Sequence, residues 1–336
     1  MKFWARAVIL SLVVCLSLFV SAQQPTEHAF LWTPQSGMKD LGSLGGSSYA
    51  NAINVHGQVA GYFVTSIGDL HAFGWTAKEG MKDLGTLGGS FSVAWGIADS
   101  GIVVGSASDA SGNTHAVAWT AGGAIRDLGT LGGATSEALG INAKGGVVGD
   151  SSLKGDTVIH AFLELCAGGM KDLGTLGGSS SFANAVNASR VVVGNSSTSG
   201  GDEHAFVWTN AGGMQDLGTL GGTSNAIGIN DLNHVIGFSV FTGGSPFHAF
   251  WWTKSGGMQD LGTLGNFDAN SDAFGVNDSD EIVGYSDTES ANGIYHAVMW
   301  QSSTHVITDL GTLGGSNSSA DAINAAGQIV GSSDIN

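Results

Sequence analysis

The sequence predicts an all-β fold, a seven-bladed β-propeller with four-stranded blades of about 44 residues. The first reason is a His-Ala pair that recurs with steps of 43 to 48 residues, a period typical of ringed or stacked repeats. The second is that no helical periodicity occurs inside a unit. The third is the phase of the repeat, because the chain begins with the last half of a unit (28–46) and ends with the first half (318–334). We expect these halves to form a blade shared between the N- and C-termini, which closes the ring and hides two sheet edges. Six whole blades then run from about 47 to 317.

The first segment of each unit, such as Tyr49 to Ile53, is apolar and leads into a short turn. Most residues at the fourth turn position are Gly, Asn or Asp, which tolerate a positive φ. The pattern predicts a tight hairpin between the first and second strands. The residues at this position are Gly57, Gly101, Gly145, Arg190, Asn233, Asp280 and Gly327.

The second segment, such as Val59 to Val64, has β-branched residues and a glycine. Glycine inside a strand usually marks a close approach of another backbone or of a large side chain. We therefore expect a crowded contact at this position in every unit.

The third segment carries the motif His-Ala-Phe-x-Trp. In His28 to Trp32, alternation places His, Phe and Trp on one face and Ala and Leu on the other. A strand that is apolar on both faces must be covered on both, as in a blade between two neighbouring blades.

The fourth segment, Met38 to Leu41, ends in Asp-Leu-Gly and leads into a glycine-rich link to the next unit. The link reads Gly-Thr-Leu-Gly-Gly in most copies. It lacks the Lys-Ser/Thr ending and the following helix of a phosphate-binding loop, so we interpret its glycines as turn residues.

Residues 1–22 are predicted to be a secretory signal peptide, and residues 23–336 a single seven-repeat propeller domain. Lys2 and Arg6 precede an apolar run that ends at the small residues Ser21 and Ala22. This run is too short for a membrane span, and no later segment is long enough. We therefore expect a secreted protein, extracellular or periplasmic, with no membrane span. Cys166 is the only cysteine after the leader, so no internal disulfide is expected.

The chain is strongly acidic, with a formal net charge of −17, and loss of the two basic residues of the leader makes it more so. An acidic surface repels phosphate backbones, so we expect no nucleic-acid partner. A cation, a positively charged partner, or a surface that only confers solubility all remain open. The expected partner is an unidentified protein or polysaccharide, and the expected oligomeric state is a monomer.

Every unit carries one histidine and one aspartate that are expected to meet. His28 and Asp40 lie at similar heights on adjacent strands, and a hydrogen bond between them would fix the loop that follows. We predict a structural role, because seven equivalent pairs have no obvious catalytic use and histidines one blade apart should not converge on one metal ion. No catalytic residue is predicted. The structural pairs are His28 and Asp40, His71 and Asp83, His115 and Asp127, His160 and Asp172, His204 and Asp216, His248 and Asp260, and His296 and Asp309.

A site is predicted where the repeat is interrupted, in the link that follows the sixth copy of His-Ala. This link has two or three extra residues, and Asp268, Asn270 and Asp272 alternate along it. Such oxygen ligands suit Ca²⁺, although Ala273 and Ser279 stand where a calcium loop would have Gly and Glu. Calcium is therefore the one possible cofactor. The alternative is that these residues form a solvated acidic surface without a bound ion.

A neighbouring loop, 286–295, shares this face in a propeller and adds Asp287 and Glu289. The equivalent loops of other units add further acidic residues to the same face: Asp69, Asp109, Asp156, Asp202 and Glu203. The predicted ligand-binding residues are Asp268, Asn270, Asp272, Asp287 and Glu289, the first three as possible calcium ligands.

A second irregularity lies in the fourth copy, where Glu164 replaces the tryptophan of the third segment and Cys166 follows it. A carboxylate in place of a buried ring would be an acid with a raised pKa. The alternative, which we favour, is that Glu164 lies at a strand end and reaches water.

With these motifs in place, the units resemble those of the HAF-repeat family of extracellular bacterial proteins. The resemblance covers residues 28–331 and rests on His-Ala-Phe at His28, His71, His160, His204 and His248, while Val117 and Val298 replace the Phe in the other two copies. It implies export and a repeat architecture. It implies no activity and no catalytic residue.

We therefore predict a secreted, non-enzymatic binding or scaffold protein of the cell envelope or extracellular space, with the face of the long loops as its contact surface. The alternative is a secreted carbohydrate-active enzyme on a propeller, which would need two carboxylates about 5–9 Å apart in a pocket. A purely structural envelope component is the third possibility.

Overall fold

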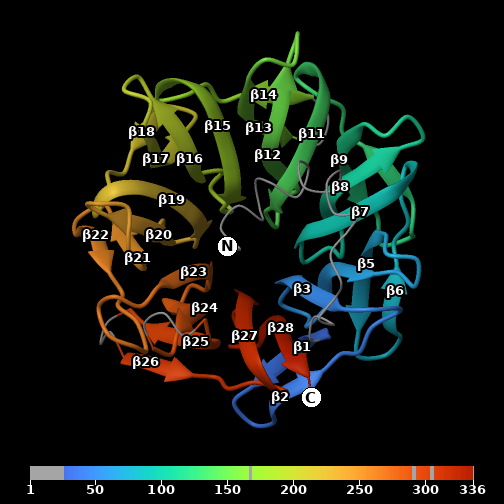
Figure 1. Ribbon diagram of the computed structural model, residues 1–336. Coiled ribbons are helices and arrows are strands. Elements are labelled where there is room, and N and C mark those ends of the chain that lie inside the picture. Colours follow the sequence, from blue (N-terminus) through green and yellow to red (C-terminus); the bar gives the residue numbers. More distant parts are fainter. Residues whose placement is uncertain (1–25, 166–168, 290–292, 303–305, 336) are drawn as a thin grey trace, which may run out of the picture.

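The computed structural model describes residues 26–165, 169–289, 293–302 and 306–335, and within these ranges it consists of strands joined by turns, without helices. Seven four-stranded antiparallel sheets surround a central axis (Figure 1), so the predicted seven-bladed β-propeller is confirmed. The described ranges therefore also hold no helix that could cross a membrane. The predicted signal peptide, residues 1–22, and Cys166 lie outside the described residues.

Six blades take their four strands consecutively from the chain, and the seventh, the closing blade, combines β27, β28, β1 and β2. Blades 1 to 6 begin at β3, β7, β11, β15, β19 and β23. The inner strands are β3 (Ser48–Ile53), β7 (Gly88–Ile97), β11 (Gly132–Ile141), β15 (Gly177–Val186), β19 (Gly221–Ile229), β23 (Ser271–Val276) and β27 (Gly314–Ile323). The second strands are β4 (Val59–Val64), β8 (Val103–Asp109), β12 (Gly146–Leu153), β16 (Val192–Thr198), β20 (Val235–Phe241), β24 (Glu281–Asp287) and β28 (Ile329–Ile335).

The third strands carry the His-Ala motif, and the outer strands end at the Asp of Asp-Leu-Gly. The third strands are β1 (Glu27–Thr33), β5 (Leu70–Thr76), β9 (Thr114–Trp119), β13 (Ile159–Leu165), β17 (Glu203–Thr209), β21 (Phe247–Thr253) and β25 (Tyr295–Gln301). The outer strands are β2 (Gly37–Asp40), β6 (Gly80–Asp83), β10 (Ile125–Asp127), β14 (Met170–Asp172), β18 (Gly213–Asp216), β22 (Gly257–Asp260) and β26 (Val306–Asp309).

The closing blade is built as the repeat phase predicts. Strand β1 pairs with β28 along its length, from Glu27 opposite Asp334 to Trp32 opposite Ile329. The N–H of Ile335 adds a hydrogen bond to the carbonyl of Thr26 at 3.1 Å. The two ends of the described chain therefore share one sheet (Figure 1), and the ring closes by backbone pairing.

The turns between inner and second strands have the predicted left-handed residue in all seven blades. The φ angle at the fourth turn position lies between 58° and 79°. Arg190 adopts φ 62° although it is neither Gly, Asn nor Asp. The tight turn therefore imposes this conformation even on a residue with no intrinsic preference for it.

One irregularity recurs in the pairing of inner and second strands. In blade 1, Ala50 pairs with Gly61 and Ala52 pairs with Ala60, so Asn51 has no partner and forms a β-bulge. The same register shift occurs in every other blade. A Cβ at Gly61 would collide with the carbonyl oxygen of Tyr49, which explains the glycine that the sequence places in each second strand.

The core lies between adjacent blades. The Phe of each motif, or the Val that replaces it at Val117 and Val298, is fully buried. The motif tryptophans are buried or half-buried beside it. Glu164, which we expected to reach water, is only 4% exposed. It occupies the position of the motif tryptophan, and that position is covered by the neighbouring blade. One of its oxygens lies 3.4 Å from Nη2 of Arg126 in the preceding blade.

The glycine-rich links differ from the prediction in one respect. In five blades the Gly-Gly pair belongs to the inner strand, as at Gly88, where β7 begins opposite Asp109. Gly89 lies so close to Ser108 and Asp109 that a side chain would not fit. These glycines therefore permit a close strand contact as well as a turn.

A ring of asparagines connects the blades on the side of the hairpin turns. The amide of Asn54 accepts hydrogen bonds from two backbone N–H groups of its own turn and donates one at 3.1 Å to the carbonyl of Ala98 in the next blade. Equivalent inter-blade bonds come from Asn142, Asn187, Asn230, Asn277 and Asn324. Blade 2 has Ala98 at this position, so the junction between blades 2 and 3 lacks this bond.

Candidate functional site

A cavity of about 260 Å³ lies on the axis of the ring, and inner strands of all seven blades line it. Its lining residues are Asn51, Ala52, Trp95, Gly96, Ile97, Leu139, Gly140, Ile141, Asn184, Ala185, Ile227, Gly228, Ile229, Phe274, Gly275, Val276, Asp321, Ala322 and Ile323. Most of these repeat from blade to blade as a small residue followed by Ile or Val. The residue before this pair also lines the cavity, and it differs from blade to blade.

The variable position is the bulge residue of each inner strand. A β-bulge turns its extra residue out of the regular alternation and often aims it at a functional site. We call these seven residues the channel ring: Asn51, Trp95, Leu139, Asn184, Ile227, Phe274 and Asp321, from blades 1 to 6 and the closing blade. All seven line the cavity, so a single backbone device presents seven side chains to one space.

Hydrogen bonds to neighbouring residues orient the polar side chains of the channel ring. The Asn51 amide donates to the carbonyl of Ala94 at 2.8 Å, and the Asn184 amide donates to the carbonyl of Ala226 at 2.8 Å. Asp321 accepts a hydrogen bond from the hydroxyl of Ser319 at 3.1 Å. Each asparagine therefore donates an amide N–H to the next blade, and its Oδ1 is an acceptor.

A second set of variable residues borders the channel ring. It consists of the cross-strand pairs whose inner-strand residue lies two positions before the bulge residue, which we call the rim pairs: Tyr49–Tyr62, Val93–Ser106, Glu137–Asp150, Phe182–Asn195, Asn225–Phe238, Asp272–Tyr285 and Ser319–Ser332. Several touch the channel ring. The rings of Tyr62 and Trp95 are 6.3 Å apart between centroids, and those of Tyr285 and Phe274 are 5.8 Å apart.

Glu137 and Asp150 form the one rim pair with two carboxyl groups, and both side chains are half-buried. Burial and the neighbouring Asp150 raise the pKa of Glu137 to about 8, and burial raises the pKa of Asp150 to about 7. Two carboxyl groups this close resist simultaneous ionisation, so near neutral pH the pair holds a proton.

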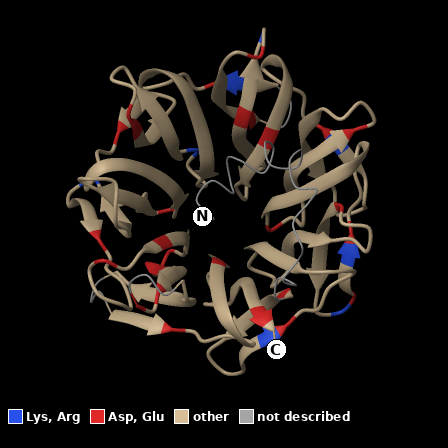
Figure 2. Cartoon of the chain, in the orientation of Figure 1, with Lys and Arg blue, Asp and Glu red and all other residues tan. Residues whose placement is uncertain are grey.

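The inner half of the propeller is acidic, as Figure 2 shows for the strands near the axis. The inner and second strands, all within the described residues, contain no Lys, Arg or His. Their acidic residues are Asp109, Glu137, Asp150, Asp272, Glu281, Asp287, Asp321 and Asp334. The basic residues of the described chain therefore lie in third and outer strands, turns and links.

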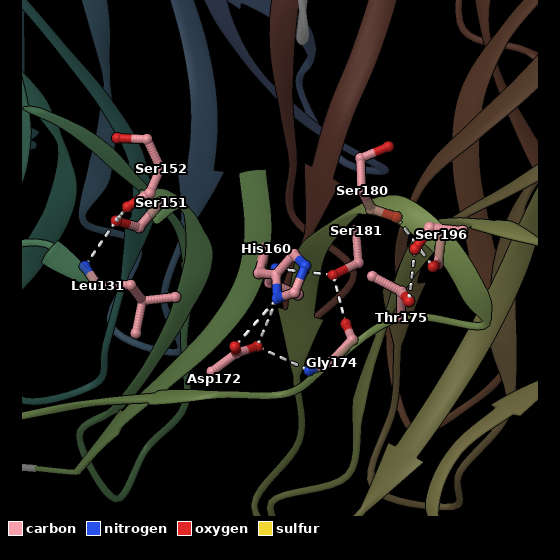
Figure 3. A network of polar contacts seen from close by, with 12 residues as sticks. Leu131, Ser151, Ser152, His160, Asp172, Gly174, Thr175, Ser180, Ser181 and Ser196 are labelled. Atoms are coloured by element: carbon pink, nitrogen blue, oxygen red, sulfur yellow. Dashed lines mark hydrogen bonds and ion pairs between the residues drawn. The ribbon is translucent and has the colours of Figure 1, made fainter. Parts of the chain in front are cut away.

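The seven His–Asp pairs are hydrogen-bonded in every blade, with Nδ1 to carboxylate distances of 2.7–3.0 Å. Each Asp also accepts the N–H of the Gly two residues later at 2.6–2.8 Å. Figure 3 shows this network at His160, where Ser181 joins it through the carbonyl of Gly174. The Ser181 hydroxyl also receives the N–H of Ala161, so the network ties one blade to the next. These contacts join the pair to the blade junction, and the structural role of the pairs stays a prediction.

His248 differs from the other six because the enlarged link covers it. Its Nε2 lies 3.0 Å from the carbonyl of Phe267, and the rings of Phe241 and Phe267 pack against it. Burial disfavours the imidazolium, but the Asp260 carboxylate and the Phe267 carbonyl outweigh it and raise the pKa of His248. The extra residues of this link therefore have a packing role.

The predicted calcium residues occupy different environments. Asp268 is exposed ahead of β23, whereas Asp272 is 2% exposed and pairs opposite Tyr285. Asn270 donates to Oδ2 of Asp287 through its backbone N–H at 3.1 Å and its side-chain amide at 2.9 Å. Glu289 is exposed. The structure thus joins Asn270 and Asp287 directly, and calcium binding at this loop stays a prediction.

The channel ring was not predicted from the sequence. Its signal was present, because the residue before each Ala/Gly-Ile/Val pair changes from copy to copy while its neighbours stay similar. Glu137 and Asp150 had no such signal, because only the strand register brings them together.

Comparison with known proteins supports the fold. Neither a protein-family model nor a curated protein matches the sequence. Among solved structures, a protein assigned as TolB from Agrobacterium tumefaciens is similar, with a TM-score of 0.53, 10% identity, and coverage of 94% of this chain and 100% of that one. TolB from Acinetobacter baumannii (TM-score 0.46, 13% identity) is covered over 62% of its length by 70% of this chain. AofleA from Arthrobotrys oligospora (TM-score 0.46, 12% identity) matches 94% of this chain and 95% of its own.

Proposed function

We propose that this protein is an exported, non-enzymatic binding module whose ligand site is the central cavity. The observation that carries the proposal is the channel ring. The repeat keeps its packing residues nearly constant, whereas the residue that the bulge of each blade presents to the cavity varies, as do the rim pairs beside it. Residues that only hold a ring together have no reason to differ in this way, whereas a ligand requires unlike groups at unlike positions.

The principal contact surface in this proposal is the channel, and not the face of the long loops that the sequence suggested. A cavity of about 260 Å³ is near the lower end of ligand pockets, which span about 300–1,000 Å³. It suits a small molecule or one residue of a larger partner. A protein or polysaccharide partner would enter with a single side chain or sugar unit.

Export and membership of the HAF-repeat family form part of the same proposal. Export rests on the basic, apolar and small-residue order of residues 1–22, and the family on the seven copies of the His-Ala motif. Expression with the native leader tests export directly. A processed chain that begins at Gln23 outside the cytoplasm supports it, and retention of the whole chain inside the cell contradicts it.

A blocked cavity tests the binding site. Leu139→Trp places a large ring in the channel, and the bulge tolerates it because Trp95 occupies the same position in blade 2. We expect ligands from a small-molecule and polysaccharide panel to raise the melting temperature of the natural protein and not that of the variant. Ligands that raise both equally bind elsewhere and contradict the proposal.

A second function, carbohydrate cleavage, is favoured by one observation, the Glu137–Asp150 pair. One protonated and one ionised carboxyl are what glycoside hydrolysis uses. Release of reducing sugar by the natural protein, abolished in Glu137→Gln, would establish it. Equal background release from both proteins would remove it.

A further inference from the structure

We propose that the ligand of the central cavity is a small neutral heteroaromatic ring that carries a hydrogen-bond donor beside an acceptor. Its face lies against Trp95 and its polar edge meets the amide of Asn51. This assignment deepens the proposed function and rests on it. Three features carry it: an aromatic wall at Trp95, an amide fixed next to that wall, and a second aromatic wall in a distant blade.

Trp95 forms an aromatic wall that tyrosines support. It is the bulge residue of blade 2, and it lines the cavity. The ring of Tyr62 in blade 1 lies 6.3 Å from it between centroids, and Tyr49 stacks on Tyr62 at 4.7 Å. Three rings therefore follow one another where blades 1 and 2 meet. A wall that is packed in this way loses little freedom when a flat ligand stacks on it.

The amide of Asn51 is fixed next to this wall. Its Nδ2 donates at 2.8 Å to the carbonyl of Ala94, the residue before Trp95. Within the described ranges this is the one hydrogen bond of the Asn51 side chain, so a second N–H and Oδ1 are left for a ligand. A donor and an acceptor on one amide recognise the edge of a heteroaromatic ring, as asparagine does with adenine.

Phe274 supplies a second aromatic wall. Its ring lies 5.8 Å from that of Tyr285, which in turn lies 5.3 Å from Tyr295. Blade 6, which carries Phe274, and blade 2, which carries Trp95, are separated by blade 1 and the closing blade. No two blades of a seven-membered ring lie further apart, so these walls are on nearly opposite sides of the axis. A flat ring offers an apolar face to each of them.

The size of the cavity limits the ligand. A volume of about 260 Å³ admits one small ring system and excludes a folded chain or an oligosaccharide. Leu139 and Ile227 complete the lining with apolar side chains. The ligand class is therefore a one- or two-ring heteroaromatic compound with a lactam or amino-heterocycle edge.

The test compares three lactams of similar size. 2-Quinolone has aromatic faces and an N–H beside its C=O, N-methyl-2-quinolone lacks the donor, and octahydro-2-quinolone keeps the lactam edge without the aromatic faces. Calorimetry on the natural protein should show binding of 2-quinolone, with each of the other two about 5-fold weaker or more.

Trp95→Leu tests the aromatic wall. It should weaken 2-quinolone binding about 10-fold and reduce the preference over octahydro-2-quinolone to within about 2-fold. Trp95→Phe is the matched control, because it keeps an aromatic face and should keep the preference. Both variants should fold, since Leu139 and Phe274 occupy the same bulge position in other blades.

Asn51→Leu tests the polar edge. It should reduce the preference for 2-quinolone over N-methyl-2-quinolone to within about 2-fold. Because it also removes the bond to Ala94, Asn142→Ala is the control: it removes an inter-blade hydrogen bond outside the cavity and should leave 2-quinolone affinity within about 2-fold. Preferences that persist in Trp95→Leu and Asn51→Leu, or no binding of 2-quinolone at millimolar concentration, overturn the inference.

The same experiment separates the two proposals. If the three lactams bind equally well and Leu139→Trp abolishes their binding, the cavity is a ligand site and only the heteroaromatic inference fails. If no lactam or panel ligand distinguishes the natural protein from Leu139→Trp, the proposed function fails with it.

Discussion

Glu137 and Asp150 show how one pair of side chains can make stability depend on pH. Both have a pKa in the folded state above the usual carboxyl value. The unfolded chain loses these protons near pH 4, whereas the folded protein keeps them until about pH 7 to 8. The contribution of the pair is therefore fully favourable below about pH 4 and is lost as the pH rises through 7 and 8.

Glu137→Gln should raise the free energy of unfolding at pH 8 by about 1–3 kcal/mol and have little effect near pH 4. The reason is that the amide removes a group that burial and Asp150 keep from ionising. Urea denaturation across this pH range measures the effect. A variant that is destabilised equally at both pH values would show that ionisation of the pair does not destabilise the folded protein at pH 8.

The buried Glu164 makes a second prediction at the level of single residues. Its Oε2 has no hydrogen-bond partner among the described residues, and Arg126 reaches only the other oxygen. At the next blade junction, where Trp208 occupies the position equivalent to Glu164, Nζ of Lys171 lies 4.6 Å from the centre of the Trp208 ring. Glu164→Trp should therefore stabilise the protein by about 1–3 kcal/mol.

Thermal or urea denaturation checks this value, with Glu164→Gln as the matched control that removes the charge without adding a ring. A fall in stability for the Trp variant would mean that the pocket around residue 164 has lost the space for an aromatic ring.

At the level of strands and turns, the asparagine ring predicts which blade junction is weakest. Only Ala98 fails to donate to the next blade, although it is as buried as the asparagines it replaces. Ala98→Asn should add one inter-blade hydrogen bond and stabilise the fold by about 0.5–1.5 kcal/mol. The matched loss, Asn142→Ala, should cost about 1–3 kcal/mol.

The urea midpoints of the two variants measure both the expected gain and the expected loss of stability. Hydrogen exchange should also slow at the hairpins of blades 2 and 3 in Ala98→Asn. An unchanged midpoint and exchange rate would show that the ring does not bind the blades together.

The strands could be predicted because their signals repeat seven times. Turn residues such as Gly57, interior glycines such as Gly61, and the alternation from His28 to Trp32 each reflect a local steric rule. The bulge at Asn51 has no such rule, since it appears only when Ala50 and Ala52 pair with consecutive residues. The cavity therefore could not be placed before the register was known.

At the level of the whole molecule, closure could be predicted from the repeat phase, and it makes the terminal strands indispensable. Deletion of residues 23–46 removes β1 and β2 and exposes the edge of β28. We expect an insoluble product or a melting temperature at least about 10 °C lower.

A circular permutant is the control. It joins the natural ends by a flexible linker and opens the chain in loop 199–202, so every strand pair is kept. It should remain soluble and cooperative. A truncated protein that melts like the full chain would refute closure through the shared blade.

The channel ring has a consequence that follows from the number seven alone. Because seven is prime, a circle of seven side chains that are not all alike maps onto itself under no rotation except a full turn, even though asparagine occurs in it twice. The backbone is nearly symmetric, yet Asp321 marks a single direction around the axis. A guest in the channel should therefore bind with one-to-one stoichiometry and in one pose, and it should give a single set of resonances.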